Sequence, residues 1–284
     1  MPRSPFIWLQ HALPQHGLSK LAGRFAASEN PLVRDLLIRR FVLAYGVDMA
    51  EAEREEGKYA SFNDFFTRSL KPGARPLADP DRFILSPADG AVSQLGRITG
   101  GSILQAKGHE YSAAELLAGD HVLAERFADG SFVTVYLSPR DYHRVHMPVA
   151  GTLRQTRYVP GKLFSVNTAT AGGVRKLFAR NERLVSLFDT QLGQVAVVMV
   201  GAMIVAAIET VWGGRVQPHG RAMVEHSFPA KGTGAVQLAA GAEMGRFLLG
   251  STVVLLFEPK RVEWLEELGE LSVLKMGEAI GRRV

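Results

Sequence analysis

A glycine-serine pair opens an apolar run near the C-terminus, where Gly250 and Ser251 precede Thr252 and the residues 253–257. A glycine before a serine lets the backbone adopt strained conformations and leaves an uncrowded carbonyl for the hydroxyl to approach. Ser251 could therefore attack the peptide carbonyl of Gly250. The same pair also fits an ordinary turn before a strand, and by itself it does not separate the two interpretations.

Two histidines, His143 and His146, lie three residues apart in the segment 138–146, which reads SPRDYHRVH. Histidine gains and loses a proton near neutral pH more readily than other side chains, so this segment could supply a base and an acid. A metal site is the alternative for the pair. No third ligand follows at a recognisable spacing and the segment is rich in turn residues, so we expect no metal.

Asp89 lies in the segment 86–90, SPADG, directly after the apolar run 83–85. An aspartate followed by a glycine after a strand is commonly only a turn signal. Placed beside a histidine and a serine, however, it completes a set of orienting group, base and nucleophile.

The elements that must position these residues begin at about residue 83, where short β-branched and aromatic runs alternate with Gly, Pro and Asp turns. The pattern predicts an α+β protein whose core is an antiparallel β-rich sandwich or barrel-like structure. The predicted strands are 122–127, 132–137, 151–159, 195–200, 203–208, 235–238 and 252–257, and two helical patches are predicted at 112–118 and 262–268.

Residues 4–52 instead have apolar side chains spaced by three and four, which predicts amphipathic helices broken at Pro14 and Pro31. Basic residues such as Arg24 and Arg39 lie between the apolar ones. Such helices fit a membrane surface, and they equally fit packing on the rest of the chain or on a second subunit.

Composition narrows the classes of function. The 284 residues carry a net charge of +5, which suits an anionic partner, either nucleic acid or an acidic lipid surface. The absence of cysteine excludes disulfides, thiolate metal sites and cysteine nucleophiles. The longest apolar run, 195–208, is shorter than the roughly 20 residues of a spanning helix, and the N-terminal residues do not resemble a secretory signal.

Taken with other motifs, these segments resemble the bacterial phosphatidylserine decarboxylase family over nearly the whole chain. The motifs that carry the resemblance are FNDFFTR (62–68), SPADG (86–90), KGH (107–109), YLSPRDYHRVH (136–146), YVPGKLFSVN (158–167), IETV (208–211), MGRF (244–247) and LGST (249–252).

The resemblance implies that the chain is a proenzyme that cleaves itself. Ser251 would attack Gly250, with His146 as base and Asp89 orienting it. Elimination and loss of ammonia would leave an N-terminal pyruvoyl group at position 251. The products would be a large chain, 1–250, and a small chain, 251–284.

The resemblance also implies that the pyruvoyl group forms an imine with phosphatidylserine and accepts electrons as CO2 leaves, giving phosphatidylethanolamine. His143 is then the candidate proton donor to the product carbon, with His146 as the alternative. Residues 1–60 would be a helical segment on the cytoplasmic face of the cell membrane, and 61–284 the catalytic domain. A homodimer of processed protomers is left open.

Two rival functions follow from the same residues. A serine hydrolase would use Asp89, His146 and Ser251 as a turnover triad, but Leu249 and Val253 stand where a Gly-x-Ser-x-Gly turn needs glycine. A non-enzymatic lipid- or nucleic-acid-binding module would leave the Gly, Ser, His and Asp motifs unexplained. We find no stacking motif of a nucleic-acid-binding protein, and we expect no nucleic-acid partner.

Overall fold

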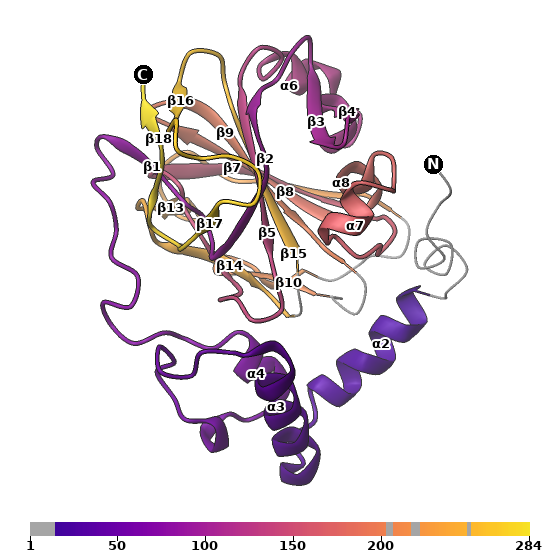
Figure 1. The fold of residues 1–284 in the computed structure, drawn as a ribbon. Coiled ribbons are helices and arrows are strands. Elements are labelled where there is room, and N and C mark those ends of the chain that lie inside the picture. Colours follow the sequence, from indigo (N-terminus) through magenta and orange to yellow (C-terminus); the bar gives the residue numbers. More distant parts are fainter. Residues whose placement is uncertain (1–14, 203–206, 217–221, 249–250) are drawn as a thin grey trace.

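The computed structural model describes residues 15–202, 207–216, 222–248 and 251–284 (Figure 1). A helical region lies below a stack of antiparallel sheets, as the α+β prediction requires, and smaller helices cover one side of the sheets. The helices are α2 (Gln15–Ala26), α3 (Pro31–Tyr45), the 3-10 helix η1 (Glu56–Lys58), α4 (Phe62–Phe66), α5 (Ala113–Leu116), α6 (His121–Glu125), α7 (Thr168–Ala171) and α8 (Leu177–Arg180).

The core is a nine-stranded sheet in which β15 lies between β9 and β5, with antiparallel pairing throughout. In spatial order its strands are β12 (Val224–Ser227), β7 (Gly151–Val159), β8 (Arg183–Thr190), β9 (Gly193–Val200), β15 (Ser251–Phe257), β5 (Ser131–Leu137), β2 (Gly90–Arg97) and β17 (Val273–Leu274), and β13 (Gln237–Leu238) pairs with β7 off this path.

Three smaller sheets complete the β structure, and among the described residues none of the sheets closes into a barrel. The first has the order β11 (Gly214–Arg215), β10 (Ile208–Thr210), β14 (Glu243–Phe247) and β6 (Arg144–His146). The second has the order β1 (Phe83–Leu85), β18 (Ala279–Arg283) and β16 (Val262–Trp264), and the third pairs β3 (Ser102–Ala106) with β4 (His109–Ser112).

Strand β15 is apolar at almost every position because both faces of the central sheet are covered. Val254 and Leu256 belong to a cluster that includes the short helices, whereas Val253 and Leu255 belong to a second cluster that includes Val145 of β6. The second cluster therefore fills the space between the central sheet and the smaller sheets, as in a β-sandwich.

The strands predicted at 132–137, 151–159, 195–200 and 252–257 are confirmed, and so is the helix within 112–118. The prediction for 122–127 is wrong. This segment begins with α6, because the Asp120 side chain accepts a 2.8 Å hydrogen bond from the backbone of Leu123 and so caps a helix. Of the strand predicted at 203–208, residues 203–206 lie outside the described residues.

The helix predicted at 262–268 is also wrong, since this segment begins with β16. Val262 pairs with Arg283 and Trp264 with Gly281 on β18. The Trp264 indole donates to the carbonyl of Gly96 at 3.1 Å. Contacts with distant strands therefore make this segment start as a strand, although its local apolar spacing is helical.

The predicted break at Pro31 is confirmed by the capping of α3. The Asn30 side chain accepts a hydrogen bond from the backbone of Leu32 at 3.0 Å, Pro31 occupies the first turn, and Gly46 ends the helix with a φ of 63°.

No helix in the described ranges is long and apolar enough to cross a membrane.

A separate apolar cluster holds the helical region together. Ile38 of α3 packs with Phe62, Phe65 and Phe66 of α4, and with Tyr59. The cluster thus joins residues on both sides of the domain boundary predicted at residue 60. That boundary stays a prediction.

Candidate active site

Ser251 is the first residue of β15, in the middle of the central sheet. Its backbone is opposite Leu137, the last residue of β5, and Thr252 is paired with Val200 of β9. Gly250, and with it the bond predicted to break, lies outside the described residues. The predicted cleavage point is therefore at the end of the sheet where β5 gives way to the histidine-bearing segment.

His143 is fully buried in the loop between β5 and β6. Its Nδ1 is 2.8 Å from the carbonyl oxygen of Asp141. Because a carbonyl can only accept, Nδ1 carries the proton and Nε2 keeps its lone pair. Nε2 is buried and has no hydrogen-bond partner among the described residues. Burial lowers the pKa of His143 to about 3, so the imidazole is neutral and its free nitrogen is an acceptor.

His146 has the same tautomer in a different setting. Its Nδ1 donates to the carbonyl oxygen of Gly241 at 2.9 Å, which leaves Nε2 as the acceptor. The hydroxyl of Tyr142 donates to that Nε2 at 3.1 Å. Burial lowers the pKa of His146 and raises the pKa of Tyr142 to about 12. His146 is thus a neutral base whose Nε2 lone pair accepts a hydrogen bond from the protonated Tyr142 hydroxyl.

Both histidines adjoin the strand that leads to the predicted cleavage point. His146 on β6 is paired with Glu243 of β14, and the His143 carbonyl accepts a hydrogen bond from the backbone of Phe247 at 3.0 Å. Strand β14 ends at Phe247, three residues before Gly250. The fold thus brings residues from two distant parts of the chain to one end of the sheet.

Asp89 is buried, and its carboxylate is held by Arg75. The guanidinium donates to both oxygens, at 2.8 Å from Nε and 2.5 Å from Nη2, and the backbone of Met276 donates at 2.8 Å. Arg75 also binds both oxygens of Glu51. No hydrogen bond between Asp89 and His146 occurs in the part of the chain that the structure describes. The predicted orienting contact is therefore replaced by bonds to Arg75 and Gly241.

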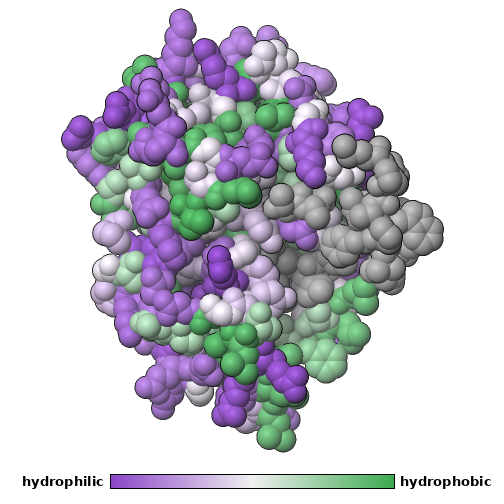
Figure 2. Space-filling model, in the orientation of Figure 1, coloured by the Kyte–Doolittle hydropathy of each residue, from purple (hydrophilic) through white to green (hydrophobic). Residues whose placement is uncertain are grey.

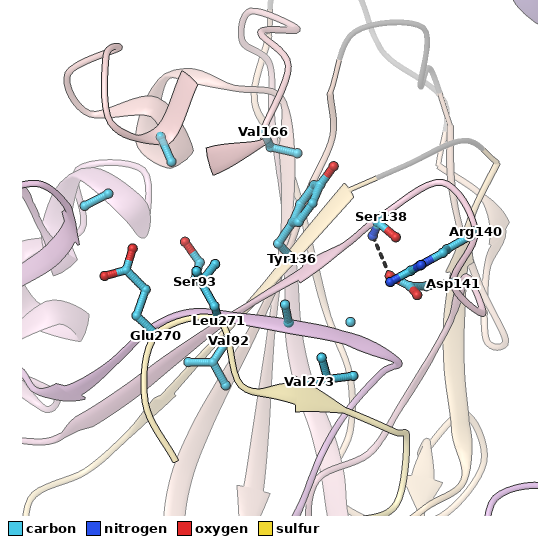
Figure 3. A pocket seen from close by; sticks show the side chains of 14 residues that line it. Val92, Ser93, Tyr136, Ser138, Arg140, Asp141, Val166, Glu270, Leu271 and Val273 are labelled. Atoms are coloured by element: carbon cyan, nitrogen blue, oxygen red, sulfur yellow. Dashed lines mark hydrogen bonds between the residues drawn. The ribbon is translucent and has the colours of Figure 1, made fainter. Parts of the chain in front are cut away.

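A cavity of about 190 Å³ opens beside Tyr136, the residue whose backbone is paired with Thr252 (Figure 3). Side chains of β2, β5 and the segment 270–273 surround it, and the turn at its edge is closed by a 2.7 Å hydrogen bond from the Ser138 backbone to Asp141. Arg140 lies on the same turn and is exposed. The cavity is smaller than the roughly 300–1,000 Å³ of a typical ligand pocket, so it has room for a small polar group.

Sequence reasoning did not single out Arg68, Arg75 or Tyr142. Arg68 and Tyr142 lie inside motifs that the sequence already marked, FNDFFTR and SPRDYHRVH, which is a signal that could have found them. Arg75 lies outside every motif, and only the fold shows its contact with Asp89. Within the described ranges, no group of three or more potential ligands could hold a metal ion.

Comparison with known proteins gives one consistent match. A family model described as phosphatidylserine decarboxylase matches residues 62–282, and a second, described as PSD, matches residues 5–46. A protein of Stutzerimonas stutzeri (strain A1501) is 57% identical over 98% of this chain and 94% of its own length. Proteins of Acinetobacter baumannii (strain ACICU) and Bordetella pertussis are 53% and 54% identical, over 98% and 97% of this chain and 96% and 93% of theirs. Each is named phosphatidylserine decarboxylase proenzyme.

These matches place the protein in a class of decarboxylases with relatives named as proenzymes. Because the first model covers more than half of the residues and the relatives align over nearly the whole length, the chain belongs to the phosphatidylserine decarboxylase family.

Proposed function

We propose that this protein decarboxylates phosphatidylserine to phosphatidylethanolamine and CO2 with a pyruvoyl group that it makes from its own Ser251. The observation that carries the proposal is the position of Ser251 at the start of the central strand, beside the segment that bears both histidines. The name proenzyme, which the relatives carry, supports processing of the chain, and the Gly250-Ser251 pair is the position that we propose for the cut. When formed, the pyruvoyl group supplies the electron sink for decarboxylation.

The residues after the proposed cut fit a chain that stays in place once it is severed. β15 is paired along its length with β5 and β9, while β17 pairs with β2 and β18 with β1. The small chain, 251–284, would therefore remain hydrogen-bonded to strands of the large chain, 1–250. Its new N-terminus would be held at the end of a buried strand.

His146 fits the role of base for self-cleavage because its Nε2 has a lone pair and its Nδ1 is fixed by Gly241. The Tyr142 hydroxyl must leave Nε2, or pass a proton to it, before His146 accepts the proton of Ser251. Asp89 would orient His146 only if its carboxylate gave up a hydrogen bond from Arg75 and accepted one from the His146 imidazole instead. Until then, its charge opposes the lowering of the His146 pKa by burial.

His143 fits the proton transfer to the product carbon in two stages. Its Nε2 is an unpaired acceptor and the low pKa keeps the ring neutral. Because burial disfavours the protonated ring, the imidazole would hold a proton from the substrate's ammonium group only transiently, as the substrate reacts, and would give it up readily to the former α-carbon. The cavity lined by Tyr136 and Asp141 has room for a serine head group and not for the acyl chains.

The acyl chains would stay in the membrane, on which we propose that the helical region rests. Large apolar side chains on α2 and α3 face outward, and Figure 2 shows them gathered over the helices at the bottom of the molecule. Leu32 and Leu43 are 83% and 81% exposed, and the exposed Arg24, Arg39 and Arg40 suit anionic head groups. The protein would then be a peripheral protein of the cell membrane, on its cytoplasmic side. A homodimer stays a prediction.

The first test is intact-mass spectrometry of the purified protein beside Ser251→Ala, with Ser227→Ala on the exposed strand β12 as the matched control. We expect the protein and Ser227→Ala to give two chains divided at 250/251, the smaller with a pyruvoyl terminus. Ser251→Ala should stay whole. Release of CO2 from phosphatidylserine in detergent micelles should follow the cleaved form. An uncut chain with full activity would overturn the proposal and favour a hydrolase-like use of Ser251.

A further inference from the structure

Three consecutive residues at the end of α4 hold the loop that bears His143. The Phe66 ring lies 4.0 Å, centroid to centroid, from the His143 imidazole. The carbonyl of Thr67 accepts a 2.9 Å hydrogen bond from Arg144 Nε. Arg68 Nη2 donates to the carbonyls of Arg140, at 3.0 Å, and of Asp141, at 3.4 Å.

The Asp141 carbonyl is shared by two donors, Arg68 and His143. Its oxygen accepts the Nδ1 proton of His143 at 2.8 Å and also faces the Arg68 guanidinium. A guanidinium is always charged and always a donor, so it keeps this oxygen polarised and in place. The carbonyl in turn fixes the tautomer and the plane of the imidazole. The Arg68 charge also acts with burial to keep His143 neutral.

Arg68 is buried without an ion pair to any residue that the structure describes, which is unusual for an arginine. The residue is only 3% exposed. Its Nε and Nη1 have no hydrogen-bond partner among the described residues. Burial lowers the pKa of this arginine, and the nearby carboxylates of Asp89, Asp141 and Glu51 oppose that lowering. The guanidinium also lies over the Phe65 ring, 5.5 Å from its centroid, and this cation–π contact offsets part of the cost of burying the charge. Among the described residues, the hydrogen bonds of this guanidinium all go to the loop that bears His143.

We infer that Phe66 and Arg68 are positioning residues for His143, and that the helical region therefore builds part of the active site in addition to contacting lipid. Phe66 belongs to the same apolar cluster as Ile38 of α3, so the cluster connects the outward-facing helix to the imidazole. The inference rests on the proposed function of His143 in decarboxylation.

The test compares Arg68→Met, Arg68→Lys and Phe66→Leu with Arg54→Met as the matched control. Arg54 lies in the same region and over the Tyr59 ring, but it pairs with Asp64 and not with the histidine loop. Self-cleavage is followed by mass spectrometry, and turnover is measured on short-chain phosphatidylserine in micelles, which removes the need for membrane binding.

We expect Arg68→Met to cleave itself but to lose about 10- to 100-fold in kcat with KM changed less, a loss similar to that seen when the outer partners of metal-bound histidines are removed. Loss of the positive charge should move the acidic limb of its pH profile to higher pH. Arg68→Lys should keep the profile, because it keeps the charge, and lose kcat, because it loses the planar fork. Phe66→Leu should lower kcat without moving the profile.

A second readout does not depend on activity. Nitrogen-15 spectra of histidine-labelled protein, assigned with His143→Gln, should show His143 as the Nδ1–H tautomer in the parent and in Arg54→Met, and as a mixture in Arg68→Met. An unchanged tautomer and unchanged kcat in folded Arg68→Met would overturn the inference. If the parent protein itself released no CO2, the proposed function would fail, and the tautomer would still decide whether Arg68 positions His143.

Discussion

Leucine occupies opposite environments in the helical region and in the central sheet. On α3, Leu32 and Leu43 are 83% and 81% exposed, whereas on β15 Leu255 and Leu256 are fully buried. Exposed apolar side chains gathered on one surface usually mark an interaction site. The sheet thus uses its apolar residues to fold, and the helices leave many of theirs free for another surface.

The ion pairs of the two regions also differ in exposure. Removing the buried pair gives the largest change in the free energy of unfolding that we expect. Arg75 and Asp89, at the sheets, have side chains 6% and 3% exposed, whereas Arg54 and Asp64, in the helical region, are 37% and 30% exposed. Arg75→Met leaves a buried carboxylate without its guanidinium and should lower the free energy of unfolding by about 3–5 kcal/mol.

Arg54→Met should lower the free energy of unfolding by less than about 1 kcal/mol, because the pair that Arg54 forms with Asp64 is partly solvated. Urea unfolding followed by circular dichroism, with all variants in the uncleaved Ser251→Ala background, measures both. Equal losses in the two variants would contradict the comparison.

Truncation of one buried leucine tests the packing of the sheet. Leu255 lies on β15 between Val133 and Val197 and is 0% exposed. Leu255→Ala should lower the free energy of unfolding by about 2–5 kcal/mol, because the neighbouring strands cannot close the cavity. The same urea titration gives the value. A loss below about 1 kcal/mol would mean that this strand is not at the centre of a packed core.

The buried His143 and the exposed His121 should differ in their effect on stability at acid pH. The folded-state pKa of His143 is about 3, below the usual 6.5 of an unfolded chain, so between these values only the unfolded state binds the proton. Stability is therefore full above pH 6.5 and falls on acidification by about 1.4 kcal/mol per pH unit from this group.

His143→Gln should make the loss of stability between pH 6.5 and pH 4 shallower, and His121→Gln, on the surface of α6, should leave it unchanged. Urea titrations at four pH values measure the slope. An identical slope in His143→Gln and the parent would show that His143 protonates freely in the folded state.

Removal of exposed leucines should have the smallest effect on folding and a clear effect on lipid binding. Leu32→Ser and Leu43→Ser, combined, should change the free energy of unfolding by less than about 0.5 kcal/mol per site. Each lost leucine removes up to about 1.5–3 kcal/mol of burial in a lipid surface, so sedimentation with anionic vesicles should fall at least about tenfold. Unchanged vesicle binding would mean that this face contacts a protein instead.

Local patterns predicted much of the fold correctly. The β-branched runs at 132–137, 151–159, 195–200 and 252–257 form strands, because period and composition suffice for segments buried in a sheet. The pattern failed at 122–127 and 262–268. In the first a capping aspartate outweighed the apolar and aromatic residues of the segment, and in the second pairing with β18 outweighed a helical spacing.

The sequence by itself determined which residues are the candidates for the chemistry, since Ser251, His143, His146 and Asp89 are all recognisable in their motifs. Only the tertiary structure decided how they are paired. Asp89 binds Arg75, both histidines donate from Nδ1 to backbone carbonyls, and Arg68 reaches a carbonyl 72 residues away. Such partners depend on how distant strands and helices pack, and no local spacing in the chain encodes that geometry.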